Sequence, residues 1–524
     1  MNESKVEPIL VDGRWRPAAL VGTYRAFDPT AARQREAVWP VSGWADVDEA
    51  LEAAVQAHAD LARRPAADLA AFLERYAERL QARAPDLVAA AHAETGLAIT
   101  PRLRDSELPR MLDTLRQAAA AAREQTWRMA MIDTATNIRA ACFGLGPVAI
   151  FPPANFPLAY GCLTGGDFVA AIAAGNPVIA KAHPGHPTVS KLAAEEAMAA
   201  VAEIGLPAAT VQLLHGVENR DGERLVADPR IGATGFTGSE AAGRALFTAA
   251  SAAGKVIWVE MGSINPVVLL PGALAERAAE IAADLTTSVT SSAGQFCTKP
   301  GLVFFVGDSA GDAFVQDVAS RFRAVGSQVL LGEGGCQRLC AGIERLLAAG
   351  GRLVTGEAAA TGPAAHVPTL VEVSAADLIA RPDELIVEAF GNATLVVRCA
   401  SLAELRQAVR LAKGSLGASF YASRSGADAA AVAAVLPLLL ALAGRIVENR
   451  MPTGLTVTPP MQHGGPWPSA GPPFFSAVGL PWSILRFARR ICFDGWTEQR
   501  LPEIVRNAPP AGSPWRYGDR AWVR

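Results

Sequence analysis

The chain has 524 residues, of which half are hydrophobic and 19% are charged, and its formal net charge is −3 at pH 7. A chain of this length exceeds what one compact core supports, so two or three domains are expected. The weakly acidic balance, without long runs of one sign, gives no reason to expect nucleic acid or an anionic membrane as a partner.

Neither a targeting segment nor a metal site is predicted. The N-terminus lacks the basic and apolar regions of a secretory signal, and the most apolar run, 427–443, is rich in alanine and contains a proline. The cysteine count is seven, and only Cys336 and Cys340 lie close together, without a second pair at zinc-site distance. We therefore expect a cytoplasmic protein without a metal ion.

The first two predicted regions are a helical block and an alternating block. Residues 44–125 are predicted to be helical, because apolar residues recur there at three- and four-residue spacing. From about Gly144, short apolar runs alternate with amphipathic segments, which predicts a parallel, doubly wound sheet with ligands at the carboxyl ends of its strands. The strands are expected at 147–151, 177–181, 211–214, 231–236 and 255–259, and the helices at 156–174, 189–204 and 239–253.

A second alternating block begins near Asn265. Strands are expected at 266–270, 302–306, 394–398 and 417–421, with a helix at 274–286. From Met461 onward the chain is rich in proline, glycine and aromatic residues and has few helix signals. We interpret this tail as a segment that packs against a partner subunit.

Four segments contain the residues suited to chemistry: PPANFPLAYGCLTGGD (152–167), GFTGSEAAGRAL (235–246), VEMGSINP (259–266) and SSAGQFCTKPG (291–301). Each alone is a weak pattern, but in this order and spacing the chain resembles the aldehyde dehydrogenase superfamily over nearly its whole length. The forms NFPLA, KAHPGHP, EMGSINP, GQFCTKPG and MQHGGPWP look most like the ketoglutarate semialdehyde (2,5-dioxovalerate) dehydrogenase branch and its NADP-linked fatty-aldehyde relatives.

The resemblance implies an α/β aldehyde dehydrogenase fold in three parts. The cofactor-binding domain, a doubly wound parallel sheet, would comprise 1–119 and 141–259, and a second α/β catalytic domain would comprise 260–460. A small oligomerisation element would combine 120–140 with the tail at 461–524. Members of the family assemble through such elements, so a homodimer or homotetramer is expected.

Cys297 is the candidate nucleophile. An aldehyde carbon cannot lose hydride while it is trigonal, so a thiolate must first add to give a thiohemiacetal, which becomes a thioester when hydride leaves. A thiol suits this step if its proton can be removed. The alternative, a buried inert cysteine, is accepted for the other six, whereas the Gly-Gln-Phe-Cys-Thr setting favours catalysis at Cys297.

Asn155 and Glu260 are the other candidate catalytic residues. The resemblance implies that the Asn155 amide and the Cys297 backbone N–H hold the developing oxyanion. An Asx turn before a helix is the alternative use of Asn155. Glu260 ends a predicted strand and would activate the water that hydrolyses the thioester; otherwise it is a strand-end carboxylate in solvent.

The predicted cofactor is NADP or NAD, and a first group of residues would contact its pyrophosphate. Gly238, Ser239 and Gly243 lie where a predicted strand leads through a glycine turn into a helix. Backbone N–H groups and the helix dipole favour an anion at such a turn. The spacing differs from G-x-G-x-x-G, and turns of this kind are common.

Further cofactor contacts follow from the resemblance. Lys181 matches the lysine that contacts the adenosine ribose, while Glu388 and Phe390 match the ribose-binding acid and the ring near the nicotinamide. NAD-preferring members place a glutamate where this chain has Pro184, so a 2′-phosphate should be tolerated. His183 is a candidate helper, although a lone histidine is equally typical of a surface.

Some residues depart from the resembling branch. Ala154 precedes the active-site asparagine where many members have tryptophan, and Asn392 replaces the usual proline. A Ser/Arg/Thr-rich stretch is expected after the GGPWP turn, but the chain has SAGPPFFS at 469–476. If that stretch holds a substrate carboxylate, its two phenylalanines indicate a more apolar pocket wall.

The sequence therefore predicts NAD(P)-dependent oxidation of an aldehyde to a carboxylic acid. An oxo-acid semialdehyde such as 2,5-dioxopentanoate is the first candidate substrate, and a medium- or long-chain aliphatic aldehyde is the second. A non-catalytic cofactor-binding protein on the same fold is a further alternative. A cysteine hydrolase is disfavoured, because none of the seven histidines lies in a motif typical of a base for Cys297.

Overall fold

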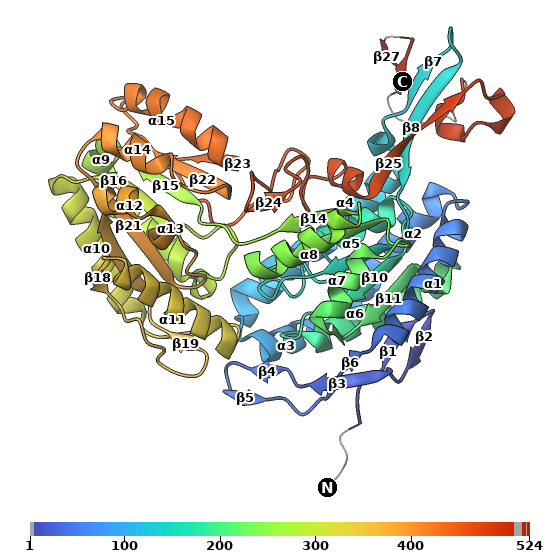
Figure 1. Cartoon of the computed structure of the whole chain (residues 1–524), viewed down its shortest axis with the longest axis horizontal. Helices are drawn as coiled ribbons and strands as arrows, with labels where there is room; N and C mark the ends of the chain where they lie inside the picture. Colours follow the sequence, from blue (N-terminus) through green and yellow to red (C-terminus); the bar gives the residue numbers. More distant parts are fainter. Residues whose placement is uncertain (1–4, 508–515, 520, 524) are drawn as a thin grey trace.

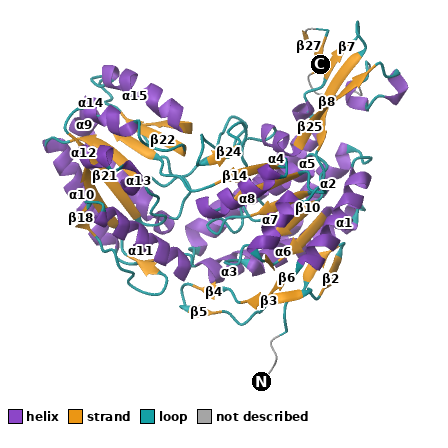
Figure 2. Cartoon of the chain, in the orientation of Figure 1, coloured by secondary structure: helices purple, strands orange, loops and turns teal. Residues whose placement is uncertain are grey.

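The structure is a computed structural model that describes residues 5–507, 516–519 and 521–523. Two α/β bodies lie side by side, each built on its own large sheet, and a smaller sheet projects away from them (Figure 1). Helices flank the strands of both bodies (Figure 2). This arrangement confirms the predicted α/β class with two parallel-sheet units.

The N-terminal part combines short strands with a block of helices, as predicted for 44–125. A three-stranded sheet of β3 (Leu20–Tyr24), β6 (Trp39–Ser42) and β12 (Gly216–Val217) lies beside the first large sheet, and β4 (Phe27–Asp28) pairs with β5 (Arg33–Gln34). The helices are α1 (Trp44–Leu61), α2 (Ala66–Ala82), α3 (Ala84–Thr95), η1 (Ile99–Glu107) and α4 (Leu108–Glu124), followed by η2 (Thr126–Arg128).

The first large sheet contains all five strands predicted for this region, in parallel. Its order is β2-β1-β11-β10-β9-β13-β14-β24. The strands are β1 (Ile9–Val11), β2 (Arg14–Arg16), β9 (Val148–Phe151), β10 (Val178–Lys181), β11 (Val211–Leu214), β13 (Ala233–Thr237), β14 (Val256–Glu260) and β24 (Ala470–Gly471). The chain order reverses at β9, which has β10 on one side and β13 on the other. Ligands of doubly wound sheets bind at such a reversal.

The strands of this sheet are buried on both faces. Val148 and Ile150 join the hydrophobic cluster beneath α2, α4, α5 (Gly166–Ala173) and α6 (Pro187–Ile204). Ala149 and Phe151 join the opposite cluster beneath α1, α7 (Asn219–Ala227) and α8 (Glu240–Ala252). Because side chains alternate along a strand, two covered faces require the continuous apolar runs seen in the sequence. The short helix η3 (Ala208–Thr210) precedes β11.

The helix predicted at 156–174 is wrong over its first half. Residues 156–165 form turns, and α5 begins only at Gly166. A side chain at Gly166 would meet the carbonyl oxygen of Ala477 at 1.8 Å, which shows how closely the tail packs here. The glycines of this segment allow that approach and interrupt the helix.

The second large sheet has the order β18-β20-β21-β16-β15-β22-β23 and includes every strand predicted for it. Its strands are β15 (Pro266–Leu269), β16 (Leu302–Val306), β18 (Arg352–Thr355), β20 (Thr369–Ser374), β21 (Ala393–Cys399), β22 (Ser415–Tyr421) and β23 (Ala443–Glu448); β17 (Gln328–Val329) pairs separately with β19 (Ala365–His366). The helices are α9 (Pro271–Thr290), η4 (Ser291–Gly294), α10 (Ser309–Val325), α11 (Glu333–Ala348), α12 (Ala375–Ala380), α13 (Pro382–Leu385), α14 (Leu402–Val409) and α15 (Ala429–Leu442).

A five-stranded sheet, in the order β25-β8-β7-β26-β27, forms the projecting arm at the upper right of Figure 1. Its strands are β7 (Met131–Asp133), β8 (Ile138–Gly144), β25 (Ala488–Asp494), β26 (Arg516–Gly518) and β27 (Ala521–Val523), and η5 (Trp482–Phe487), η6 (Glu498–Arg500) and η7 (Glu503–Val505) lie in the same tail. Among the described residues, no helix is both long and apolar enough to span a membrane.

Candidate active site

The candidate nucleophile lies in a loop that one buried asparagine fixes in place. Cys297 follows η4, and the Nδ2 group of Asn265 donates hydrogen bonds to the carbonyl oxygens of Cys297 (2.8 Å) and Lys299 (3.0 Å). Asn265 is fully buried and has a φ of 50°, in the left-handed region that asparagine tolerates better than most residues. The Lys299 ammonium donates to the carbonyl oxygens of Ala389 (3.0 Å) and Ala393 (2.6 Å), which anchors the loop on its other side.

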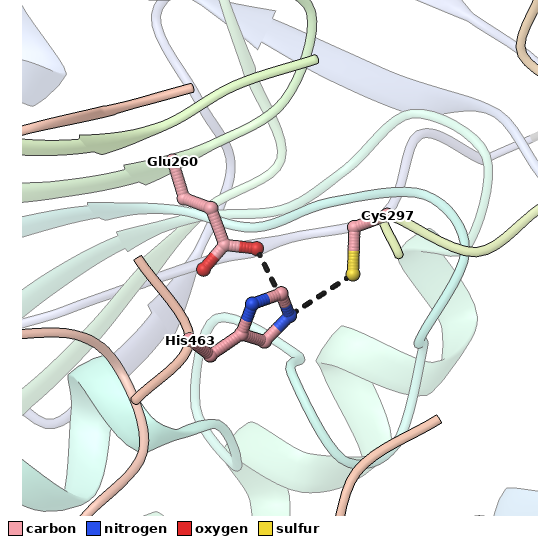
Figure 3. Close-up of side chains that lie close together, drawn as sticks. All are labelled: Glu260, Cys297 and His463. Atoms are coloured by element: carbon pink, nitrogen blue, oxygen red, sulfur yellow. Dashed lines mark hydrogen bonds and ion pairs between the residues drawn. The ribbon is translucent and has the colours of Figure 1, made fainter. Parts of the chain in front are cut away.

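Three reactive side chains meet at this loop (Figure 3). The Sγ atom of Cys297 lies 3.0 Å from Nε2 of His463, and the same nitrogen lies 3.4 Å from Oε1 of Glu260. Glu260 ends β14 in the first body, Cys297 lies in the second, and His463 belongs to the chain that returns between them. The Cys297 sulfur, which is neither sealed in a core nor fully exposed, therefore has a proton acceptor in direct contact.

The surroundings shift the pKa of all three groups. Burial, together with the negative charge of Asp167, raises the pKa of Glu260 to about 8. Burial also raises the pKa of the Cys297 thiol, with a second contribution from the Glu260 carboxylate. Burial lowers the pKa of His463 to about 3, so its imidazole is neutral near pH 7. The thiol thus needs a base, and Glu260 is the stronger of the two nearby.

A cavity of about 20 Å³ lies beside the carboxyl group and the imidazole. Glu260, His463, Phe475 and the ion pair of Asp167 with Arg486 (2.5 Å) are among its lining residues. A space of this size accommodates about one water molecule, and polar groups surround it. The site therefore has room for a single water next to its carboxylate.

Asn155 is held beside the nucleophile loop by a buried ion pair. Its Nδ2 group donates to the backbone carbonyl oxygen of Gln295 (2.9 Å), and the backbone carbonyl oxygen of Asn155 accepts from Arg102 (2.8 Å). Arg102 also pairs with Glu107 (2.6 Å), whose carboxylate accepts from the backbone N–H groups of residues 158 and 159 (2.8 and 3.0 Å). An amide group has two N–H bonds, so one donor of Asn155 is left for a substrate oxygen.

The predicted pyrophosphate turn leads from β13 into α8. Ser239 caps the helix, accepting from the N–H of Ala242 (3.4 Å). The N–H of Gly238 donates to the carbonyl oxygen of Glu260 (3.0 Å), so this glycine links the turn to the catalytic strand. A side chain at Gly243 would meet Sδ of Met261 at 2.5 Å, which shows that this glycine permits close helix–strand packing.

The remaining cofactor candidates line the same region. Lys181 ends β10 and is half-buried, and among the described residues no carboxylate pairs with it, which leaves its charge for an anionic or hydroxyl-bearing ligand. Glu388 accepts from the N–H of Ser263 (3.1 Å), and the adjacent carbonyl of residue 389 binds Lys299, so Glu388 and Phe390 lie at the nucleophile loop. His183 lies two residues after Lys181, and its Nδ1 atom accepts a hydrogen bond from the N–H of Gly185 (3.0 Å).

Sequence reasoning missed the main contact of the nucleophile. We disfavoured every histidine as a base for Cys297, yet His463 lies against it, 166 residues away in sequence. The segment MQHGGPWP contributed to the resemblance, but nothing in its pattern assigned a role to the histidine. The donor atoms of Cys297, His463 and Glu260 lie within 4.8 Å of one another, a set that also suits zinc. We interpret them as a catalytic group, because the thiol–imidazole contact already has hydrogen-bond geometry.

The fold and site together define a class of protein: an enzyme with a cysteine nucleophile, a neighbouring carboxylate and a nucleotide-type turn at the switch point of a doubly wound sheet. The sequence matches the model of the aldehyde dehydrogenase family over residues 15–465. The chain therefore belongs to the aldehyde dehydrogenase family and is an NAD(P)-dependent enzyme of that family.

Two curated relatives cover nearly the whole chain. The alpha-ketoglutaric semialdehyde dehydrogenase 2 of Azospirillum brasilense is 38% identical, covering 95% of this chain and 96% of its own length. The alpha-ketoglutaric semialdehyde dehydrogenase of Acinetobacter baylyi is 33% identical, covering 94% and 95%. These matches support the resemblance to this branch that the motifs indicated.

Solved structures confirm the predicted fold. The gamma-glutamyl-gamma-aminobutyraldehyde dehydrogenase of Burkholderia cenocepacia superposes with a TM-score of 0.79 at 21% identity, over 93% of this chain and 96% of that one. An NADP-dependent glyceraldehyde-3-phosphate dehydrogenase of Bacillus halodurans, solved with NADP, gives 0.78 at 20% identity, over 93% and 99%.

Proposed function

We propose that this protein oxidises an oxo-acid semialdehyde, such as 2,5-dioxopentanoate, to the corresponding acid through a thioester on Cys297. The observation that carries the chemistry is the contact between Cys297, His463 and Glu260 beside a water-sized cavity. The substrate class is supported by the names of the two curated relatives that cover nearly the whole chain.

Acylation begins at the thiol. The Cys297 proton passes to Nε2 of His463 at 3.0 Å and from there to the Glu260 carboxylate at 3.4 Å. The sulfur then bonds to the aldehyde carbon, and the carbonyl oxygen becomes an oxyanion that the free N–H of Asn155 stabilises. A bound NAD(P)⁺ would supply the hydride acceptor that oxidation of the thiohemiacetal to the thioester on Cys297 requires.

Hydrolysis of the thioester uses the same carboxyl group. Once Glu260 has released its proton to solvent, its carboxylate removes a proton from a water in the adjacent cavity. The resulting hydroxide attacks the thioester carbon, the carbon–sulfur bond breaks, and the acid leaves while Cys297 is regenerated. His463 contacts both Sγ and Glu260, so it can return the proton to the sulfur.

Residues of both bodies would hold the cofactor. Lys181 suits the adenosine ribose. The N-terminus of α8, with Gly238 and Ser239 before it and Gly243 in its first turn, suits the pyrophosphate. Glu388 with Phe390 suits the nicotinamide half. Pro184 carries no charge that would repel a 2′-phosphate, so NADP should bind as well as NAD. His183 is a secondary candidate, because its Nδ1 atom already accepts a backbone N–H.

The test is an absorbance screen for reduced nicotinamide, with an aldehyde panel and both cofactors. We expect turnover with 2,5-dioxopentanoate, and none by Cys297→Ala, which should still bind cofactor. Full oxidation by that variant would refute the thioester mechanism. Preference for n-alkanals would instead favour the medium-chain alternative, for which the exposed Phe474 and the cavity-lining Phe475 are the supporting observation. Absence of turnover with any aldehyde would favour a non-catalytic protein.

We further propose a cytoplasmic homodimer or homotetramer that assembles through the predicted element of 120–140 and 461–524. The projecting sheet supports this proposal, since β25 is an edge strand among the described residues, and an edge strand offers its backbone groups for pairing with another chain. Light scattering coupled to size-exclusion chromatography tests it, and a monomer at micromolar concentration would contradict it.

A further inference from the structure

Two arginines beside the nucleophile loop have no carboxylate partner. Arg110 lies on α4 and Arg445 on β23, and neither forms an ion pair with any described residue. Both are partly buried. A partly desolvated guanidinium without an anion is costly, and nearby Arg450 adds like charge to Arg445. Such a pair is typical of a site that binds an anionic group.

The guanidinium groups of Arg110 and Arg445 bind backbone carbonyl groups of the same loop. Arg445 donates to the carbonyl oxygens of Pro452 (3.1 Å) and Gly454 (2.7 Å), and Arg110 donates to that of Leu455 (2.8 Å). Residues 454 and 455 are consecutive, with Cα atoms about 3.8 Å apart, so the two groups flank one short stretch of backbone.

The same loop lies against the nucleophile. Thr453 donates from Oγ1 to the carbonyl oxygen of Thr298 (3.3 Å), the residue after Cys297. On the other side, Arg110 faces the ring of Phe156 with 6.0 Å to its centroid, and Phe156 packs against Phe296 at 5.8 Å between centroids. The two guanidinium groups therefore bind the loop that contacts the residue next to Cys297.

A hydrogen-bond donor completes the surroundings. The Oη atom of Tyr160 is buried without a hydrogen-bond partner among the described residues. Its ring packs edge-on against Phe156 (5.1 Å between centroids) and lies 6.4 Å from the ring of His463. A buried hydroxyl without a partner is costly, so a polar group of a bound substrate would satisfy it.

We propose that Arg110 and Arg445 form the subsite that recognises the distal carboxylate of the aldehyde substrate, with Tyr160 as an additional donor. The proposal rests on the proposed oxo-acid function and names the residues that select for the acid. In this proposal the two arginines bind the substrate carboxylate in place of the stretch at 469–476, where two phenylalanines make the pocket wall more apolar. Two guanidinium groups favour a planar carboxylate through charge-assisted hydrogen bonds.

The experiment compares three aldehydes with the same five-carbon chain: 5-oxopentanoate, which carries a distal carboxylate, its neutral methyl ester, and n-pentanal, which has no carboxyl group. For the unmodified protein we expect kcat/KM to be highest for 5-oxopentanoate. Arg110→Met should lower that value about 10- to 100-fold, as for loss of a hydrogen bond to a charged group, and leave n-pentanal nearly unchanged. Arg116→Met is the matched control, because Arg116 is an exposed residue of the same helix.

Two variants of Arg445, Arg445→Lys and Arg445→Met, distinguish loss of the positive charge from loss of the folded structure. The Lys variant keeps a cation and should retain more activity towards 5-oxopentanoate than the Met variant, while equal thermal midpoints would show that both are folded. Tyr160→Phe should cost less than either arginine. Calorimetric titration of glutarate into Cys297→Ala, with and without Arg110→Met, measures the subsite without turnover.

The outcomes are distinguishable from failure of the proposed function. No oxidation of any aldehyde would overturn the function itself. Oxidation of all three substrates with equal kcat/KM would leave the enzyme assignment intact and overturn the carboxylate subsite. So would equal losses for 5-oxopentanoate and n-pentanal in Arg110→Met, because a charge-recognition role predicts a selective loss.

Discussion

Replacing Glu260 by glutamine tests whether the catalytic carboxyl is held in an unfavourable environment. Burial and the charge of Asp167 raise its pKa to about 8 from 4.5. In the unfolded chain the carboxyl titrates near its ordinary value of about 4.3. Between these values the folded protein retains a proton that the unfolded chain has released, so stability must fall as pH rises through this window.

The size of the expected loss of stability follows from the pKa shift of Glu260. A shift of about 3.5 pKa units (8 − 4.5) at ~1.36 kcal/mol per unit gives an upper limit of about 5 kcal/mol in the free energy of unfolding above pH 8. The side chain is 12% exposed and borders a cavity that can admit water, so we expect roughly half of this limit. Glu260→Gln removes the charge, and therefore should be more stable than the parent protein at alkaline pH.

The assay is denaturant unfolding of both proteins across a pH series from 5 to 9. We expect the smallest difference between the midpoints at the acid end, because pH 5 lies only about 0.7 units above the pKa of this carboxyl in the unfolded chain, and a growing advantage of Glu260→Gln up to about pH 8. Glu223→Gln, an exposed substitution on α7, is the control and should show no such trend. A difference that is constant across the series would refute the pKa argument.

The same variant has a kinetic signature. Because hydrolysis needs the ionised carboxylate, steady-state turnover of the parent protein should rise with pH through about 8. Glu260→Gln should lower steady-state turnover by about 10²- to 10⁴-fold, as for loss of a general base. Unchanged steady-state turnover would refute the role of Glu260.

Three further predictions follow from the contacts. His463→Phe should slow alkylation of Cys297 by iodoacetamide at neutral pH by about tenfold or more, measured by mass spectrometry of the labelled peptide, because the thiol loses the acceptor at 3.0 Å; an unchanged rate would count against the proton path. Glu107→Gln should lower the free energy of unfolding by about 3–5 kcal/mol, since it leaves the buried charge of Arg102 without its partner, and a denaturant midpoint equal to that of the parent would contradict this. Pro184→Glu should lower the ratio of NADP to NAD efficiency roughly tenfold through repulsion of the 2′-phosphate, and steady-state kinetics with both cofactors would expose a ratio that does not move.

The central strands were predictable because both faces of each sheet are covered. In β9 and β15, alternate side chains enter opposite clusters, as Val267 and Val268 do in β15, so these strands are apolar throughout. The helix prediction at 156–174 failed for a tertiary reason. Gly166 accommodates a backbone carbonyl of the tail at a distance that any side chain would occupy, and the tail lies 311 residues further on.

The candidate catalytic residues Cys297, Glu260 and Asn155 were predicted from motifs, whereas the residues that contact and support them were not. His463, Arg102 and Glu107 act through contacts that depend on the folded chain, and none of them has a local pattern that distinguishes it from a surface or core residue. Arg102 and Glu107 are five residues apart, whereas side chains that pair on an α-helix surface are three or four apart, so the sequence contains no local signal for this ion pair. The burial of Glu107 becomes visible only in the structure.

The segment 259–266 shows why one short motif carried so much information. Glu260 is the proposed base, and its carbonyl oxygen accepts a hydrogen bond from the N–H of Gly238 in the proposed cofactor turn. A side chain at Gly262 would meet Oε2 of Glu388 at 2.2 Å, so it would displace that carboxylate from its present position. Asn265 then fixes the loop of Cys297. The proposed base, the proposed cofactor turn and the loop of Cys297 are all attached to the backbone of 259–266. A substitution at Glu260, Gly262 or Asn265 should therefore change the distances between these three parts of the site.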